Sequence, residues 1–390
     1  MNADKKQIKK LNIVFASHTF IGGTFVVGSH HLAREFSELG NNVLHISTPL
    51  SPLHFIKLNN KIVRTKFKRA FFNPSIKIGQ SLIDLIPFTL LPWQLNKYLK
   101  ISENPSLQFL TPSISYLMRK NGMDNVDVLL IDQPSFQGIE KYVKPKIIIY
   151  RATDLYRELT GNNEILTYEK KIASISNGIV GTSQPVLNHL KSLNDKIPSK
   201  VLENGVEYNH FANQTTQPKE YNGITGLKVV YAGAVDERLD ISAIEFLAQK
   251  LTNVSVIIIG PDSKNKLDKL RKYNNVHILG PRPYSKLPAY LEHADIGILP
   301  LSDHFSNTGR SPMKLYEYGA AGIPVVVTAT PELLRRNEKF IFHYYDYEEF
   351  ISIVSKLDIE KLDSNMIKKE VKVHSWESKA KELLDFIMNI

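Results

Sequence analysis

The chain has 390 residues, more than one hydrophobic core normally fills, so we expect two domains. Its 43% hydrophobic and 23% charged residues are typical of a globular protein. It contains no cysteine, which excludes disulfides and thiolate chemistry and fits a reducing compartment. No apolar run reaches the length of a transmembrane helix and no signal-peptide core follows the basic first ten residues, so we expect a cytoplasmic protein.

The formal net charge of +10 is concentrated in the first half of the chain. Residues 1–200 hold 26 of the 49 basic and 14 of the 39 acidic residues, a net charge of +12, whereas residues 201–390 carry −2. No acidic residue stands between Glu38 and Asp84, a stretch that contains Lys57, Lys61, Arg64, Lys66, Lys68, Arg69 and Lys77. Such a patch attracts phosphates, either of nucleic acid or of an anionic membrane.

Apolar strand-like runs alternate with helix-like segments along the first half of the chain. A helix is expected over residues 26–39, closed by Gly40. Strands are expected at residues 11–16, 42–46, 126–132, 146–150 and 178–181. Because near-continuous apolar strands that alternate with helices are typical of parallel sheets covered on both faces, this half predicts a doubly wound α/β domain.

The second half repeats this scheme after a boundary that we place at residues 203/204. Strands are expected at residues 227–233, 254–260, 276–280, 296–300 and 324–328, and helices at 242–251, 286–293 and 312–318. An amphipathic helix is expected over residues 376–390, with an apolar side formed by Leu383, Leu384, Phe386 and Ile387.

The most informative segment, residues 306–328, reads as a polar loop, a short helix, a glycine turn and a buried strand. A helix N-terminus presents unpaired N–H groups and the positive end of the helix dipole, which suits a phosphate. Lys314 and Glu317 lie three residues apart, so one helix face offers a cation for a pyrophosphate and a carboxylate for ribose hydroxyls. The same spacing also occurs on solvated surfaces, so it leaves both interpretations open.

The sequence Ser-Pro-Met-Lys-Leu-Tyr-Glu-Tyr at residues 311–318, followed by Ala-Ala-Gly-Ile-Pro-Val-Val at 320–326, resembles the donor-site segment of GT-B glycosyltransferases. The resemblance covers nearly the whole chain and implies two Rossmann-like doubly wound domains that face a central cleft. It assigns residues 1–203 to acceptor binding and residues 204–375 to the nucleotide sugar. It also implies that the helix 376–390 crosses back onto the first domain.

The resemblance further implies a set of donor-binding residues: Thr308, Gly309, Arg310, Ser311, Met313, Lys314, Glu317, Arg238, Arg282 and Tyr284. Lys314 would stabilise the departing diphosphate. Arg282 or Tyr284 would lie against the base of the nucleotide, although the turn at 281–284 equally fits a structural segment made rigid by two prolines. The chain contains no Asp-x-Asp, the usual anchor for Mn²⁺ or Mg²⁺, so we expect a metal-independent enzyme without a cofactor.

One departure from the family pattern concerns the stereochemistry. Many retaining GT-B enzymes carry a second glutamate eight residues before the first, where this chain has Gly309. The pair Met313–Lys314 and the segment Tyr-Arg-Ala-Thr-Asp at 150–154 resemble more closely the xanthan-type glucuronosyltransferases and the teichuronic-acid glycosyltransferases. In that group the aspartate is the general base of an inverting reaction, which implies this role for Asp154.

Asp154 also fits a simple cap of a helix that begins at Leu155, and Asp132 and Glu158 are alternative carboxylates. By their position after the first strand or beside Asp154, four residues are expected to face the acceptor: His18, Gly22, Gly23 and Arg151.

Residues 51–108 match the family least and combine cations with large apolar side chains, so we expect them to form a membrane-facing insertion in the first domain. A lipid-linked acceptor at an anionic bilayer explains this composition better than nucleic acid, for which no motif is present. The expected membrane-facing residues are Lys57, Lys61, Arg64, Lys66, Lys68, Arg69 and Trp93. The alternative is a charged loop that covers the domain's own core.

Taken together, the sequence predicts an enzyme of the hexosyl- or glucuronosyltransferase type at the inner face of the cell membrane. It would transfer a sugar from a UDP-sugar to a lipid-linked or polysaccharide acceptor in surface-polysaccharide biosynthesis, with inversion and without a metal. The alternatives are a UDP-sugar epimerase on the same fold and a catalytically degenerate scaffold.

Overall fold

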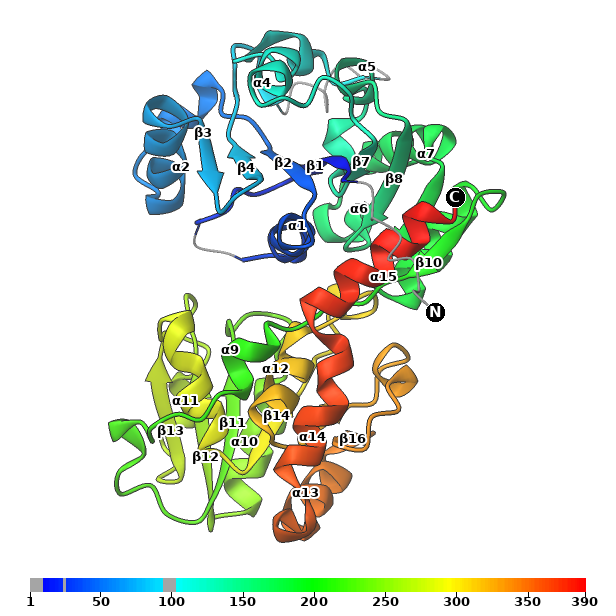
Figure 1. Cartoon of the computed structure of the whole chain (residues 1–390). Coiled ribbons are helices and arrows are strands. Elements are labelled where there is room, and N and C mark those ends of the chain that lie inside the picture. Colours follow the sequence, from blue (N-terminus) through cyan, green and yellow to red (C-terminus); the bar gives the residue numbers. More distant parts are fainter. Residues whose placement is uncertain (1–9, 24–25, 94–102) are drawn as a thin grey trace. The chain divides into compact units, whose positions relative to one another are not determined.

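The computed structural model of the chain describes residues 10–23, 26–93 and 103–390. It divides into two compact units, one formed by Met1–Glu203 with Lys379–Ile390 and the other by Asn204–Ser378 (Figure 1). Each unit has its own sheet and its own core, so each is described by itself.

The first unit is built on a sheet whose strands follow the order β10-β9-β8-β7-β1-β2-β4-β3. All neighbours run parallel except β3 and β4, which pair antiparallel. The strands are β1 (Asn12–Ser17), β2 (Asn42–Ser47), β3 (Ser75–Ile78), β4 (Leu82–Leu85), β7 (Val128–Ile131), β8 (Ile147–Ala152), β9 (Gly178–Gly181) and β10 (Ser199–Val201). Central strands such as β7 are buried at every residue, as expected for a parallel sheet covered on both faces.

The helices and remaining strands of this unit connect the sheet strands and cover them. The helices are α1 (Gly28–Glu38), α2 (Lys61–Phe72), α4 (Ile114–Lys120), α5 (Glu140–Val143), α6 (Tyr156–Thr160), α7 (Glu164–Ile175) and α8 (Gln184–Leu193), with 3₁₀ turns η1 (Pro52–Lys57), η3 (Pro105–Phe109) and η4 (Pro134–Phe136). The short strands β5 (Phe88–Thr89) and β6 (Leu110–Thr111) pair antiparallel as a separate ribbon.

The second unit has a fully parallel sheet in the order β13-β12-β11-β14-β15-β16, which is the strand order 3-2-1-4-5-6 of a Rossmann fold. The strands are β11 (Leu227–Ala232), β12 (Val254–Ile259), β13 (Val276–Gly280), β14 (Ile296–Leu299), β15 (Val325–Thr328) and β16 (Ile341–Tyr344). The helices are α9 (Tyr208–Ala212), α10 (Ile241–Lys250), α11 (Leu287–Glu292), α12 (Met313–Ala321), α13 (Tyr347–Lys356) and α14 (Ser364–Val371), with a 3₁₀ turn η8 (Phe305–Asn307).

The predicted α/β fold with two doubly wound parallel sheets is confirmed. Strand β9 and strand β13 have the predicted bounds, and the other predicted strands shift by one or two residues at their ends. One interpretation was wrong: residues 51–108 are not merely an insertion, because β4 pairs in register with β2 inside the main sheet.

The end of the chain packs on the first unit through α15 (Trp376–Met388), which ends two residues before the predicted bound. Lys379 Nζ lies 2.9 Å from Glu203 Oε2, and Lys200 Nζ lies 2.9 Å from Glu382 Oε1. A β-carbon at Gly178 would lie 2.7 Å from Ile390 Cδ1, so the glycine lets the last turn approach β9 closely.

In both sheets the strand order reverses between the first strand and its partner on the other side, β1 with β7 and β11 with β14. At such a point the connections leave in opposite directions, and the carboxyl ends of the two strands open a crevice that commonly binds ligands. Two of the functional residues predicted from the sequence lie at these points: His18 follows β1, and Lys314 reaches the end of β11.

Candidate functional site

In the second unit, the loop 300–312 connects the carboxyl end of β14 to α12, and Pro312 stands at the N-cap of that helix. The Pro312 side chain makes no capping hydrogen bond to this helix. The Leu315 N–H donates to the Pro312 carbonyl oxygen at 3.3 Å, and the N–H groups before it are placed to meet water or an anion. The left-handed Gly322, with φ of 88°, ends the helix and turns the chain into β15.

Lys314, on the first turn of α12, reaches the carboxyl end of β11. A β-carbon at Gly233 would lie 2.1 Å from Lys314 Cε and 2.7 Å from its Nζ, so the amine lies directly over this glycine. Gly260, at the end of β12, has φ of 149°, and a β-carbon there would lie 1.8 Å from the Gly233 carbonyl oxygen. Two glycines thus keep the end of the sheet bare where the amine lies.

Positive charge gathers around this amine. Burial and the nearby guanidinium groups of Arg310 and Arg238 together lower the pKa of Lys314 to about 8, against the opposing effect of Glu317. Burial works against the ionised form of Asp236, but hydrogen bonds from Arg238 outweigh it and bring the pKa of Asp236 to about 2. A half-buried ammonium next to two arginines is an arrangement that a polyanion would stabilise.

Glu317 lies one turn after Lys314 on the same helix and is half-buried. Burial raises the pKa of Glu317, Lys314 lowers it, and the nearby carboxylate of Glu207 raises it. Sequence reasoning missed Glu207, which is 110 positions away in the chain and has no motif of its own. This side of the site therefore offers hydrogen-bond acceptors beside a cation.

Most of the remaining predicted donor residues lie on loops and turns of the same unit, and Met313 is the first residue of α12. Ser311 Oγ accepts a hydrogen bond from the Asn204 backbone N–H at 3.1 Å, and Thr308 is exposed. Arg282 donates to the Tyr290 hydroxyl at 3.0 Å and pairs with Glu220 at 3.3 Å. Tyr284 stacks on His210 with ring centroids 4.8 Å apart. The predicted contact of Arg282 or Tyr284 with a base stays a prediction.

In the first unit, two of the predicted residues are buried instead of facing an acceptor. Arg151 is fully buried, and its Nη1 donates to Asp132 Oδ2 at 2.7 Å. The expectation that Arg151 contacts the acceptor is therefore wrong, because its guanidinium is enclosed with its counterion. Burial raises the pKa of Asp132, although Arg151 and His45 favour the ionised form. Asp132 is thus a structural partner of Arg151, unsuited to act as an accessible base.

Asp154 is half-buried beyond the end of β8. Helix α6 takes Leu155 as its N-cap without a side-chain cap, so the alternative role of Asp154 as a helix cap is not supported. Asp154 Oδ2 lies 3.0 Å from the Thr153 hydroxyl, which lies 2.8 Å from the Tyr156 hydroxyl. Tyr156 in turn contacts the Asp132 carbonyl oxygen.

The number of protons available to these three contacts depends on whether Asp154 is ionised. With Asp154 ionised, Thr153 donates to Asp154 and Tyr156 donates to the Asp132 carbonyl, which leaves no proton between the two hydroxyl oxygens. With Asp154 protonated, each of the three contacts has one proton. Asp154 then donates to Thr153, Thr153 donates to Tyr156, and Tyr156 donates to the carbonyl oxygen of Asp132. The network therefore stabilises a carboxylic acid at Asp154 once that group has taken up a proton.

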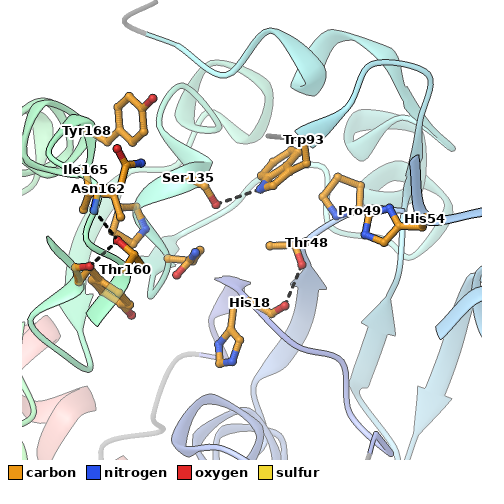
Figure 2. Close-up of a pocket in the computed structure, with 13 residues that line it drawn as sticks. His18, Thr48, Pro49, His54, Trp93, Ser135, Thr160, Asn162, Ile165 and Tyr168 are labelled. Atoms are coloured by element: carbon orange, nitrogen blue, oxygen red, sulfur yellow. Dashed lines mark hydrogen bonds between the residues drawn. The ribbon is translucent and has the colours of Figure 1, made fainter. Parts of the chain in front are cut away.

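A pocket of about 320 Å³ lies at the carboxyl ends of β1, β2 and β7 in the first unit (Figure 2). Of the four residues expected to face the acceptor, only His18 is among its described lining residues; Gly22 and Gly23 lie in the turn after β1. The lining residues are His18, Thr48, Pro49, His54, Trp93, Gln133, Pro134, Ser135, Tyr156, Thr160, Asn162, Ile165 and Tyr168. Sequence reasoning missed most of these, although Gln133 directly follows one predicted strand and Thr48 stands two residues after another, which was an available signal.

Three residues predicted to face a membrane are turned inward. Lys66 donates to the Thr48 carbonyl oxygen at 2.6 Å, Arg69 lies 2.9 Å from the buried Asp84, and Trp93 is only 7% exposed. Those three predictions are wrong, because the side chains satisfy buried partners inside the unit. Arg64 and Lys68 are exposed, and the side chains of Lys57 and Lys61 lie outside the described part of the structure.

Comparison with known proteins finds a family match within the second unit. The sequence profile of the family "Glycosyl transferases group 1" matches residues 227–358, which span β11 to α13 and include the site around Lys314. A curated relative, the putative teichuronic acid biosynthesis glycosyltransferase TuaH of Bacillus subtilis, is 26% identical over 239 residues. That match covers 57% of this chain and spans 60% of the relative's length.

The whole chain is similar in fold to solved glycosyltransferase structures. Sucrose-phosphate synthase from Thermosynechococcus elongatus superposes with a TM-score of 0.69 at 13% identity, over 97% of this chain and 99% of that one. Anabaena Alr3699/HepE, solved in complex with UDP-glucose, superposes with a TM-score of 0.60 at 13% identity, over 97% and 100% of the two chains. These similarities show a GT-B fold.

Proposed function

We propose that this chain transfers a sugar from a nucleotide-sugar donor, with UDP as the nucleotide, to a polysaccharide or lipid-linked acceptor, since residues 227–358 match the family model of the group 1 glycosyltransferases. The observation that carries the proposal is the cluster of Lys314, Arg310 and Arg238 at the uncapped N-terminus of α12. The teichuronic acid relative and the UDP-glucose complex of Anabaena HepE support the substrate class.

In this proposal the second unit stabilises the leaving group. Breaking the bond between the sugar and the diphosphate leaves negative charge on the diphosphate oxygens. Lys314, Arg310 and the first N–H groups of α12 neutralise that charge, an electrostatic effect that lowers the barrier because the donors are already in place. Glu317, with Glu207 behind it, accepts hydrogen bonds from the ribose hydroxyls.

Asp154 serves as the general base in an inverting reaction. It takes the proton of the acceptor hydroxyl as that oxygen attacks the anomeric carbon from the face opposite the diphosphate. The network through Thr153 and Tyr156 supports this role because it is complete in hydrogen bonds only when Asp154 is protonated. Gly309 at the position of the second glutamate of retaining enzymes favours inversion as well.

We further propose that the reaction needs no metal. The cations at α12 occupy the electrostatic role that a divalent ion fills elsewhere. Addition of EDTA should therefore leave the transfer rate unchanged, and restoration of a lost rate by Mn²⁺ would reject the proposal.

The first unit also carries a surface that suits a lipid bilayer. No helix of the described residues is long and apolar enough to cross a membrane. Instead, Phe55, Ile56, Phe71 and Phe72 are exposed around α2 and η1, with 80% of Ile56 and of Phe72 exposed, and we name these four residues the apolar patch. Within the patch the rings of Phe55 and Phe71 are 6.4 Å apart, and Arg64 and Lys68 on α2 are exposed.

Apolar side chains beside cations insert shallowly into anionic membranes. Replacing one inserted side chain, as in Phe72→Ser, should cost roughly 1.5–3 kcal/mol of binding to vesicles that contain anionic lipid, about tenfold or more in the partition coefficient. Val373→Ser in the second unit, also at an exposed apolar residue, is the matched control. Equal vesicle sedimentation of both variants and the unchanged protein would reject the membrane contact.

A panel of nucleotide sugars tested by thermal shift, followed by Asp154→Asn, tests the proposed function. The correct donor should raise the melting temperature of the protein, since ligands that bind only the native state stabilise it. Asp154→Asn should keep that shift and lose transfer. Turnover of a UDP-sugar without any acceptor would instead indicate an epimerase, and absence of a shift with every UDP-sugar would indicate a scaffold.

A further inference from the structure

We infer that the pocket of the first unit binds one uncharged sugar ring of the acceptor, an inference that rests on the proposed function. The pocket lies where the strand order reverses between β1 and β7, the usual ligand position in such a sheet. Its volume of about 320 Å³ is at the lower end of the range for small-molecule sites, roughly 300–1,000 Å³. That size suits a single ring and its substituents.

The lining chemistry matches a carbohydrate. A sugar ring has hydroxyl groups that both donate and accept, and C–H faces that pack on aromatic rings. The pocket provides both partners: amides and hydroxyls that donate and accept, and aromatic side chains (Figure 2). The polar side chains are Thr48, Gln133, Ser135, Thr160 and Asn162, and the aromatic ones are Trp93, Tyr156 and Tyr168.

Asn162 gives the most specific indication. Its Oδ1 accepts a hydrogen bond from the Glu164 backbone N–H at 3.2 Å, which fixes the orientation of the amide. Its Nδ2 is buried and has no partner in the described protein. A buried amide donor without a partner is costly, and a ligand that draws this side chain toward the pocket it lines would remove the cost by accepting from its amide.

The electrostatics favour an uncharged ring over a uronic acid or a sugar phosphate. None of the described lining residues is an Asp, Glu, Lys or Arg. Burial lowers the pKa of His18, and the positive Lys66 and the nearby His45 lower it further, so its imidazole is neutral at pH 7. An anionic ligand would give up its hydration here without gaining a counterion.

Lys66 is a described cation that acts on His18, and its ammonium is hydrogen-bonded elsewhere. Its Nζ donates to the Thr48 carbonyl oxygen at 2.6 Å and to Thr48 Oγ1 at 3.1 Å, and that hydroxyl donates to the His18 carbonyl oxygen at 2.8 Å. Burial lowers the pKa of Lys66 to about 8, with Asp84 opposing. Lys66 therefore orients a wall residue and does not line the pocket.

The pocket also adjoins the proposed base. Tyr156 lines the pocket, and its hydroxyl is connected through Thr153 to Asp154. A ring held against Tyr156 would lie two hydrogen bonds away from Asp154, so the pocket selects the acceptor that is presented to this base.

Saturation-transfer NMR with the full chain tests this inference. The probes are the methyl glycosides of glucose, galactose and N-acetylglucosamine, compared with methyl glucuronide and glucose 6-phosphate. At least one uncharged glycoside should receive saturation, and the two anionic sugars should receive none. Asn162→Ala and Gln133→Ala should each weaken that binding roughly threefold to tenfold, the value of one lost hydrogen bond. Gln217→Ala, at an exposed amide of the second unit, is the matched control.

UDP binding by the same variants separates this inference from the proposed function. Unchanged UDP affinity shows that the variants are folded and that the donor site is intact. Stronger binding of the anionic sugars, no binding of any uncharged glycoside, or equal binding by Asn162→Ala and Gln217→Ala would overturn the sugar pocket. Sugar binding without UDP binding would reject the proposed function and leave the pocket standing.

Discussion

Replacing Lys314 by Met removes the ammonium at α12 and keeps most of the side-chain volume. The structure gives this lysine a pKa of about 8, lowered first by burial and then by Arg310 and Arg238. A lysine with that pKa is about nine-tenths protonated at pH 7 and about one-tenth at pH 9. If the diphosphate binds the protonated form, UDP affinity should fall about tenfold over this range, or about 1.4 kcal/mol.

Lys314→Met should weaken the binding of UDP and, at the same time, stabilise the fold of the ligand-free protein. A charged hydrogen bond to phosphate is worth roughly 1.5–3 kcal/mol, so Lys314→Met should weaken UDP binding at pH 7 by roughly tenfold to a hundredfold. The same change should stabilise the ligand-free protein. Because the folded pKa of about 8 lies below the ordinary 10.5, the charged lysine disfavours folding below pH 8, by an amount that corresponds to roughly 3 kcal/mol. That penalty disappears as the pH rises through 8 to 10.5.

Isothermal titration calorimetry with UDP at pH 7, 8 and 9 measures the first effect, and thermal unfolding without ligand measures the second. The original protein should lose affinity toward pH 9, while Lys314→Met should show little further loss. Glu317 can also titrate at this site, since burial raises its pKa. If Lys314 is the group responsible, Glu317→Gln should keep the fall of UDP affinity above pH 7. Lys286→Met, at an exposed lysine, is the matched control. A UDP affinity that does not change with pH in the original protein, or that changes equally in Lys314→Met, would refute this account of the site.

Three further changes test separate parts of the structure. Gly233→Ala should displace the Lys314 amine, because the new β-carbon would lie 2.1 Å from Lys314 Cε. UDP affinity should therefore fall as in Lys314→Met. Calorimetry of the double variant that carries both changes should show that the two losses of affinity do not add. Tyr156→Phe should reduce transfer roughly tenfold to a hundredfold with unchanged UDP affinity, because it breaks the network that holds the proton on Asp154; unchanged turnover in a coupled assay of UDP release would contradict this. Asp84→Asn should lower the free energy of unfolding by roughly 3–5 kcal/mol, since it leaves the buried Arg69 and His45 contacts without a counterion, and denaturant unfolding that differs by less than about 1 kcal/mol would reject this role.

The donor segment could be predicted from the sequence because its parts are adjacent in the chain. The loop, helix α12, Gly322 and β15 follow one another, so local patterns place Lys314 and Glu317 on one helix face. Glu207 and Gly260 could not be found in this way. They reach the site only through the arrangement of β11, β12 and α9, and no local pattern encodes that arrangement.

The first unit shows a different limit of sequence reasoning. A run of cations indicates that a segment is basic, but it does not indicate which cations face inward. Lys66 and Arg69 turn inward because β2 and β4 present Thr48 and Asp84 to them. Asp84 offered a usable signal in the sequence, since it is the first acidic residue after a long basic stretch and stands in an apolar run. In the structure it is fully buried between His45 and Arg69.

The net charge of each half also indicates the wrong location for the anion site. The first half of the chain carries a charge of +12, yet the described lining of its pocket is uncharged. The second half carries −2, yet it gathers Lys314, Arg310 and Arg238 at the edge where a phosphate would bind. Phosphate binding needs a few cations held at the end of a sheet, with acids such as Asp236 fixing their positions, and it does not need a basic domain. The excess charge of the first half lies instead partly on the exposed face of α2, beside the apolar patch, where attraction to a membrane surface needs total charge more than exact placement.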